Sequence, residues 1–213
     1  MSTFRDLGVR KDFINSLKEL KIKNPTDIQE KTIPVLLKSD TDFVGLAQTG
    51  TGKTAAFGLP ILNTIDASKA EVQGLIIAPT RELATQVESE IKKLGKYTAV
   101  KSTCVYGGTA YEGQIRALRK EKPQIVVGTP GRVIDLLKKN ILKLDKADFC
   151  VLDEADEMLN MGFFEDVQLV LEKFRASREL IMFSATMPKP IVKMINNSFN
   201  NPLMVQIEKK SDW

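Results

Sequence analysis

Histidine is absent from the 213 residues, which removes the commonest metal ligand and the commonest general base from consideration. Only two cysteines are present, Cys104 and Cys150, far apart and each inside an apolar run. A metal or redox site would need closer spacing or partner ligands. We therefore expect both thiols to be buried as small hydrophobic groups, which suits a reducing compartment.

The chain also lacks long apolar runs, internal repeats and low-complexity stretches. No run approaches the about 20 residues of a membrane span, and residues 1–6 contain no signal-peptide stretch. The sequence therefore predicts a soluble, cytoplasmic protein with no membrane partner. The formal net charge is only +4. This value is compatible with a nucleic-acid partner but does not indicate one, because a local basic patch is what counts.

Short apolar runs alternate with amphipathic helical patterns along most of the chain. The runs are rich in Val, Ile, Leu and Phe without polar alternation, which is typical of strands buried on both faces. This order predicts an α/β fold built from right-handed βαβ units, with a parallel sheet and helices on both faces. The runs span residues 43–47, 74–78, 102–106, 124–127, 149–152 and 180–183, with a further strand at 202–207. The helical patterns lie at residues 9–20, from 26 onward, and at 83–94, 133–137 and 163–174.

The segment Ala47–Thr54 follows the first predicted strand and opens a helix. It matches the P-loop pattern except at its first position, where alanine replaces the usual glycine. Gly50 and Gly52 let the backbone wrap closely around phosphates. Lys53 brings positive charge to the outer phosphates, and the Thr54 hydroxyl can ligate Mg²⁺. A glycine-rich turn without a ligand is the alternative, and the position between strand and helix favours the phosphate loop.

Two adjacent carboxylates, Asp153 and Glu154, end the fifth apolar run. An acid at the tip of a buried strand is costly without a partner, and in P-loop enzymes a strand-end Asp holds Mg²⁺. Glu154 can then orient and deprotonate the attacking water. Capping of the following helix is the alternative role of the pair. The sequence thus predicts ATP and Mg²⁺ as cofactors, with catalytic residues Lys53, Asp153 and Glu154 and metal ligands Thr54 and Asp153.

Polar turns follow the other predicted strands, at residues 79–82, 107–108, 129–132 and 184–186. The carboxyl ends of parallel strands meet at one edge of a sheet, where ligands bind. Arginines, hydroxyls and exposed N–H groups in these turns suit the phosphates of an extended polyanion. Each turn also has a purely structural interpretation. Thr129-Pro130 fits a helix start, Gly107-Gly108 fits a simple turn, and Arg81 fits a solvated helix charge.

Taken in order, these motifs resemble those of the first RecA-like domain of a DEAD-box RNA helicase, including Asp-Glu-Ala-Asp at residues 153–156. The resemblance implies that the whole protein couples ATP hydrolysis to the remodelling of RNA duplexes. Residues 1–207 would form this domain, with residues 1–40 flanking the Q motif. Residues 208–213 would be a tail or the start of a linker to a second RecA-like domain in cis. By itself the domain is expected to be monomeric and nearly inactive.

The resemblance also implies an adenine site. Gln29 would read the edge of the base, and Phe4 matches an upstream aromatic of the family. The family's usual glycine and stacking aromatic are replaced here by Lys21 and Ile22, so aliphatic packing would replace stacking. Residues 26–29 also fit a capping box, which by itself accounts for glutamine at this position.

The implied roles fall into three groups. Ser184 and Thr186 would hydrogen-bond to Asp156 and couple the ATP state to RNA binding. The implied nucleotide-binding residues are Phe4, Ile22, Thr26, Gln29, Thr49, Gly50, Thr51, Gly52, Lys53 and Thr54. The implied RNA-backbone contacts are Pro79, Thr80, Arg81, Gly107, Gly108, Thr129, Gly131 and Arg132. Two alternatives stay open: a P-loop ATPase that acts on DNA or protein, and a non-catalytic RNA-binding or adaptor domain, against which the intact charged residues argue.

Overall fold

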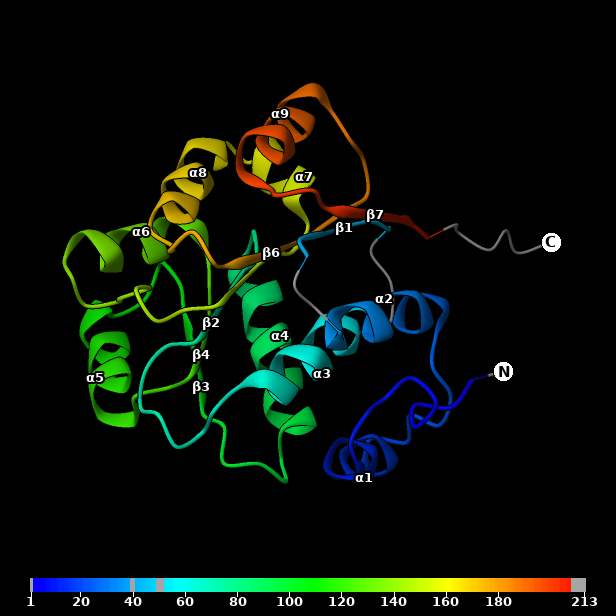
Figure 1. Cartoon of the computed structure of the whole chain (residues 1–213). Coiled ribbons are helices and arrows are strands. Elements are labelled where there is room, and N and C mark those ends of the chain that lie inside the picture. Colours follow the sequence, from blue (N-terminus) through cyan, green and yellow to red (C-terminus); the bar gives the residue numbers. More distant parts are fainter. Residues whose placement is uncertain (1, 39–40, 49–51, 208–213) are drawn as a thin grey trace.

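The computed structural model describes residues 2–38, 41–48 and 52–207, which form a parallel sheet covered by helices (Figure 1). The strand order in the sheet is β3-β4-β2-β5-β6-β1-β7, and every neighbouring pair is parallel. The predicted parallel α/β fold is therefore confirmed. The strands are β1 (Phe43–Leu46), β2 (Gly74–Ile77), β3 (Ser102–Val105), β4 (Ile125–Gly128), β5 (Phe149–Leu152), β6 (Glu179–Ser184) and β7 (Leu203–Gln206).

Helices connect the strands and also precede the first one. Those labelled α1, α2, α4, α6 and α8 correspond to predicted patterns, and α3 is the helix expected after the phosphate loop, whereas α5 and α9 do not follow from the patterns above. The helices are α1 (Lys11–Glu19), α2 (Asp27–Leu37), α3 (Lys53–Thr64), α4 (Arg81–Leu94), α5 (Tyr111–Glu121), α6 (Pro130–Lys138), α7 (Ala155–Asn160), α8 (Phe164–Glu172) and α9 (Lys189–Ser198). Within the part of the chain that the structure describes, no helix is long and apolar enough to cross a membrane.

The sheet separates two hydrophobic clusters, which explains why its strands are apolar throughout. On β2, Leu75 and Ile77 pack into one cluster and Ile76 packs into the other, and all three are inaccessible to solvent. Side chains from α1 to α4 complete the cluster around Ile76, and side chains from α5 to α9 complete the other. Helices therefore lie on both faces, and only the strand ends remain free to carry a site.

The two cysteines are unpaired, as expected from their spacing. Cys150 is fully buried in β5, and burial raises the pKa of its thiol. Cys104 is only half-buried, so its predicted full burial is wrong, because β3 is the last strand of the sheet on its side. Burial, with a smaller contribution from the charge of Glu88, raises the pKa of Cys104 to about 11. Both thiols are therefore protonated and unreactive near neutral pH.

Candidate functional site

A buried ion pair lies at the edge of the sheet where the polar segments that follow β1 and β5 meet. Lys53, the first residue of α3, places its Nζ 2.7 Å from Oδ1 of Asp153, which directly follows β5. Burial raises the pKa of Asp153, and the charge of Lys53 opposes that rise. Oδ2 of Asp153 has no hydrogen bond of normal geometry from the described residues. A fully buried carboxylate oxygen that the described residues leave without such a hydrogen bond suits a cation site.

Glu154 follows in a left-handed conformation with φ of 53°. It occupies the N-cap position of α7, yet its side chain makes no capping hydrogen bond. The interpretation of Glu154 as a helix cap is therefore wrong, and the half-buried carboxylate faces the site. Desolvation raises the pKa of Glu154, and Lys53 opposes this effect. A raised pKa makes this carboxylate a stronger base than an exposed glutamate.

A cavity of about 650 Å³ brings the predicted nucleotide groups together. Its lining includes Lys53, Thr54, Asp153, Glu154 and Gln29. Aliphatic and polar residues of α4 close one side, a wall that the sequence motifs do not indicate. Thr49, Gly50 and Thr51, predicted to hold phosphates, lie outside the described residues.

The Q-motif residues hold the start of α2 against the phosphate loop. The main-chain N–H of Thr26 donates to Gln29 Oε1 at 2.9 Å, and the Gln29 N–H donates to Thr26 Oγ1 at 3.4 Å, which completes the capping box. Gln29 Nε2 also donates to the carbonyl of Gly52 at 3.0 Å. Gly52 has φ of +94°, and a Cβ there would lie 2.7 Å from Gln29 Nε2. Only glycine fits this contact without displacement.

The structure describes both residues that depart from the family pattern, Lys21 and Ile22. Lys21 has φ of 60°, so it adopts the left-handed conformation in which glycine is usual. Ile22 lines the nucleotide cavity, in keeping with aliphatic contact to a base. Phe4 is buried under α1 and lines a neighbouring cavity, not this one. Its role at the adenine site therefore stays a prediction.

The turn after β2 begins α4. Pro79 is buried, and the Thr80 hydroxyl accepts a hydrogen bond from the N–H of Leu83 at 3.2 Å, so Thr80 caps the helix. The Arg81 guanidinium is exposed and lies 4.7 Å from the ring centre of Tyr106. Tyr106 follows β3, and the sequence motifs do not indicate its contact with this arginine.

Arg132, after β4, is held by residues that precede and open α5. Its Nη1 donates to Gln114 Oε1 at 2.9 Å, and its guanidinium lies 4.9 Å from the ring centre of Tyr111. Thr129 is the N-cap residue of α6 and Pro130 is its first residue, as the structural interpretation of this turn expects, but the Thr129 side chain makes no capping bond. The Thr129 hydroxyl is not committed to the helix.

Three glycines in these turns leave their backbone open. Gly107, Gly108 and Gly131 are exposed, and a Cβ on any of them would meet nothing within 4 Å. Gly108 requires glycine for a separate reason, since its φ is +82°. The exposed main chain at these positions is free to approach a ligand.

Asp156 is tied to the turn after β6. Thr186 donates to Asp156 Oδ2 from its N–H at 3.1 Å and from its hydroxyl at 2.9 Å, so the predicted contact is confirmed. The predicted bond from Ser184 to Asp156 is wrong. Ser184 is still part of β6 and nearly inaccessible, and its hydroxyl donates to the carbonyl of Thr186 at 2.7 Å. Ser184 therefore supports the turn, and Thr186 alone meets the carboxylate.

Comparisons of the sequence with protein families and with curated proteins point to the same family. The family described as "DEAD/DEAH box helicase" matches residues 26–195. An "ATP-dependent RNA helicase CshA" of Listeria monocytogenes is 48% identical over 210 residues, covering 99% of this chain and 40% of the relative. A "DEAD-box ATP-dependent RNA helicase CshA" of Geobacillus kaustophilus is 46% identical over the same length, with 99% and 44% covered.

Solved structures agree with this result. A DEAD box protein from Methanococcus jannaschii superposes with a TM-score of 0.93 at 37% identity, covering 97% of this chain and 56% of that chain. A hypothetical ATP-dependent RNA helicase from Sulfolobus tokodaii gives 0.85 at 37% identity, with 93% and 57% covered. The chain thus spans less than half the length of the two curated relatives above. In fold and in sequence, the chain belongs to the DEAD/DEAH box helicase family.

Proposed function

We propose that this chain is the N-terminal RecA-like domain of a DEAD-box ATP-dependent RNA helicase. The observation that carries the proposal is the cavity lined by Gln29, Lys53, Asp153 and Glu154, beside a sheet edge with two arginine-bearing turns. The names of the relatives, ATP-dependent RNA helicases, support the same activity. Their greater length supports a second RecA-like domain in cis. The domain boundary at 207, the monomeric state and the cytoplasmic location stay predictions.

ATP and Mg²⁺ would share the cavity. The residues fit the ion, because Asp153 offers a buried carboxylate oxygen that the described residues leave without a hydrogen bond of normal geometry, and Thr54 offers a hydroxyl in the same cavity. When bound, Mg²⁺ would neutralise charge on the outer phosphates. Lys53 neutralises Asp153 in the described state, so a triphosphate would compete for the same ammonium group. Gln29 would hold the base side of the nucleotide while bracing the Gly52 carbonyl.

The protein groups then divide the reaction among them. Glu154 would orient the attacking water and take its proton, aided by the raised pKa of its carboxyl group. Lys53 would stabilise charge on the transferred phosphoryl group. Asp156 and Thr186 would link this strand end to the turn after β6 and couple nucleotide state to RNA binding.

RNA would bind along the turns after β2, β3 and β4. Arg81 and Arg132 offer guanidinium groups that neighbouring aromatic rings hold in place, and the exposed glycines offer main-chain N–H groups. Contacts of this kind are made to phosphates and sugars, so they would bind RNA without regard to its base sequence.

The experiment that tests this function uses the full-length protein. ATP hydrolysis should be stimulated by single-stranded RNA but not by DNA, and an RNA duplex should be unwound only with ATP. Equal stimulation by DNA would favour the alternative of a DNA-dependent ATPase. No nucleotide hydrolysis under any condition would favour a non-catalytic RNA-binding domain.

A further inference from the structure

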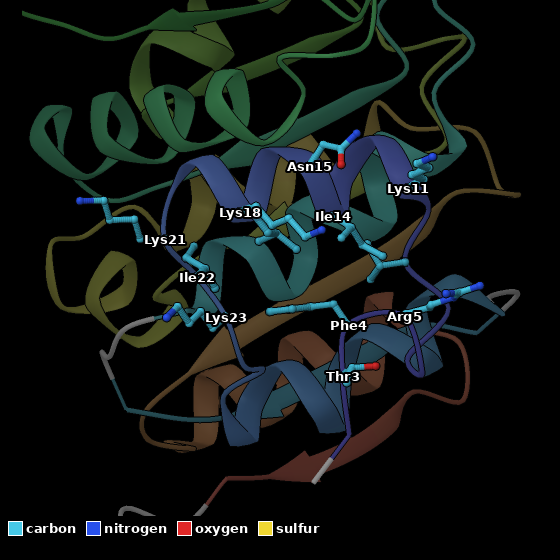
Figure 2. Close-up of a pocket in the computed structure, with 12 residues that line it drawn as sticks. Thr3, Phe4, Arg5, Lys11, Ile14, Asn15, Lys18, Lys21, Ile22 and Lys23 are labelled. Atoms are coloured by element: carbon cyan, nitrogen blue, oxygen red, sulfur yellow. The ribbon is translucent and has the colours of Figure 1, made fainter.

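A second and larger cavity, of about 990 Å³, lies between the N-terminal segment, α1 and residues 21–23 (Figure 2). Its lining shares Ile22 with the nucleotide cavity but contains none of the phosphate-site residues Lys53, Asp153 and Glu154. The volume lies at the upper end of the range for small-ligand pockets, about 300–1,000 Å³. The function proposed above leaves this cavity without a role.

The interior of the cavity is aliphatic. Leu17 and Val9 are buried in its floor, while Ile14 and Ile22 are half-buried and remain in reach of a ligand. Its one aromatic lining residue in the described part of the chain is Phe4, which is only 5% exposed. Nucleobases bind single-strand proteins largely by stacking on exposed aromatic faces. An aliphatic group therefore suits this cavity better than a base.

The rim carries charge of one sign. Arg5, Lys11, Lys18, Lys21 and Lys23 line the cavity, all five are exposed, and none forms an ion pair with another described residue. No acidic side chain belongs to the described lining. Unpaired cations around an apolar hollow form a surface that is complementary to an anion with an apolar part.

The arrangement of these cations limits the shape of the ligand. On α1, Lys11, Ile14 and Lys18 recur at helical spacing and share the face that lines the cavity. Figure 2 shows Arg5 and Lys11 at one end, Lys21 and Lys23 at the other, and Ile14 and Lys18 between them. A fatty acid, with one anionic end, would use only one of these groups. A ligand with negative charge on both sides of an aliphatic centre would use both.

We propose that this cavity is a docking site for an acidic segment of a partner protein, which inserts an aliphatic side chain between α1 and the N-terminal segment. Acidic residues on either side of that anchor meet the lysines at the two ends. Binding energy at such sites concentrates in the buried anchor, while the charged rim sets specificity and association rate. The described lining of this cavity contains no residue of the phosphate site and none of the RNA-facing turns.

The test uses the full-length protein and a short fluorescent peptide in which aspartates and glutamates flank two central leucines. A matched peptide replaces the leucines with serines. In fluorescence anisotropy we expect saturable binding of the leucine peptide and at least about tenfold weaker binding of the serine peptide, because serine loses the apolar surface that a leucine anchor buries. Isoleucine methyl signals in NMR spectra of the unmodified protein should report the same event at Ile14 and Ile22.

Charge-reversal variants locate the binding. The double substitution Lys11→Glu/Lys18→Glu should weaken binding of the leucine peptide at least about tenfold, because the two new carboxylates on α1 repel the acidic peptide. Lys189→Glu/Lys193→Glu on α9 makes the same change in net charge at exposed residues away from the cavity, and should leave binding within about twofold. Thermal unfolding of each variant checks that the fold is intact. If the α1 variant fails to fold, the NMR signals of the unmodified protein still show whether the peptide binds in this cavity.

Several outcomes would overturn the proposal. Equal losses in the two double variants would mean general charge attraction, and equal binding of the serine peptide would mean that no anchor is inserted. Displacement of the peptide by saturating ADP and Mg²⁺ would assign the cavity to the nucleotide. Binding of a short RNA that depends on Lys11 and Lys18, with no peptide binding, would assign the surface to RNA.

Discussion

At the scale of single residues, Lys53 and Asp153 depend on each other. Their ion pair is nearly inaccessible, and breaking a buried pair by removing one partner costs about 3–5 kcal/mol in stability. The pKa of Asp153 is already raised by burial, and the loss of Lys53 would raise it further. Protonation of Asp153, together with the cavity beside it, limits the damage to the fold.

Lys53→Ala should therefore leave a folded but less stable protein that has lost most of its nucleotide affinity. We expect at least about tenfold weaker ADP binding, because a hydrogen bond to a charged group contributes about 1.5–3 kcal/mol. Isothermal titration calorimetry measures the affinity, with Lys193→Ala on α9 as the control. An unchanged ADP affinity in the folded variant would remove Lys53 from the site.

Glu154→Gln should keep ATP binding in the presence of Mg²⁺ while slowing hydrolysis about 10²–10⁴-fold, the range for loss of a general base. RNA-stimulated turnover of the full-length protein is the measurement, and Glu157→Gln, an exposed neighbour, is the control. A base acts when deprotonated, so hydrolysis should fall as the pH drops through the raised pKa of Glu154. Near-normal turnover in Glu154→Gln would place the base elsewhere.

The adenine side can be tested separately from the capping box. Gln29→Glu keeps an acceptor for the Thr26 N–H but loses the amide that donates to Gly52, whereas Gln29→Ala loses both. If Gln29 reads the base, both changes should reduce the ratio of ADP to GDP affinity. Ile22→Phe should tighten ADP binding, because ring stacking adds about 0.5–1.5 kcal/mol. Equal affinity of the unmodified protein for ADP and GDP would leave only the capping role.

At the scale of elements, the sequence predicts those strands and helices that a clear pattern of apolar residues marks. Buried strands such as β5 were predictable to the residue because their runs are continuous and end in polar turns. Helix α5 was not, because Leu118 is its only buried residue and its apolar stripe of Tyr111, Ile115 and Leu118 is narrow. Helix α9 does bury Ile191, Met194 and Ile195, but prolines flank its first residue and obscure its start.

The same distinction applies to the site. Local motifs predicted which residues gather, but not the contacts made between elements. The Lys53–Asp153 pair joins the ends of β1 and β5, and Arg132 meets α5, so both depend on the order of strands in the sheet. Ser184 was misplaced for a related reason, because its burial at the end of β6 is a property of the whole sheet.

Helix α5 offers a prediction at this scale through Gln114. Its side chain bonds both main-chain groups of Tyr106, at 3.1 and 2.8 Å, and also Thr109 and Arg132, so one residue joins two RNA-facing turns. Gln114→Leu should release Arg132 and weaken single-stranded RNA binding about tenfold, since loss of one charged hydrogen bond costs about 1.5–3 kcal/mol.

RNA anisotropy with the full-length protein and calorimetry with ADP give the two readouts for Gln114→Leu. RNA affinity should fall while ADP affinity stays the same, because Gln114 does not line the nucleotide cavity. Gln168→Leu on α8 is the matched control. Parallel loss of both affinities would mean that the substitution disturbs the fold rather than the turns.

At the scale of the whole molecule, the question is what this domain can do alone. Phosphoryl transfer depends on positioned positive charge, and an arginine supplied from outside the phosphate loop is worth about 10³–10⁵ in rate in related P-loop enzymes. No arginine lines the nucleotide cavity in the part of the chain that the structure describes. With one domain the phosphates also stay open to water, which weakens every electrostatic contact around them.

RNA affinity is limited by the same geometry, because backbone binding grows with the number of phosphates that are neutralised. Two arginines, Arg81 and Arg132, face the proposed path from this domain. We therefore expect residues 1–213 to bind ADP weakly, to bind single-stranded RNA poorly, to hydrolyse ATP negligibly and to unwind no duplex. ATPase and unwinding assays beside the full-length protein are the measurement. Strong RNA-stimulated hydrolysis by residues 1–213 alone would mean that the site is completed within this chain or by a second copy of it.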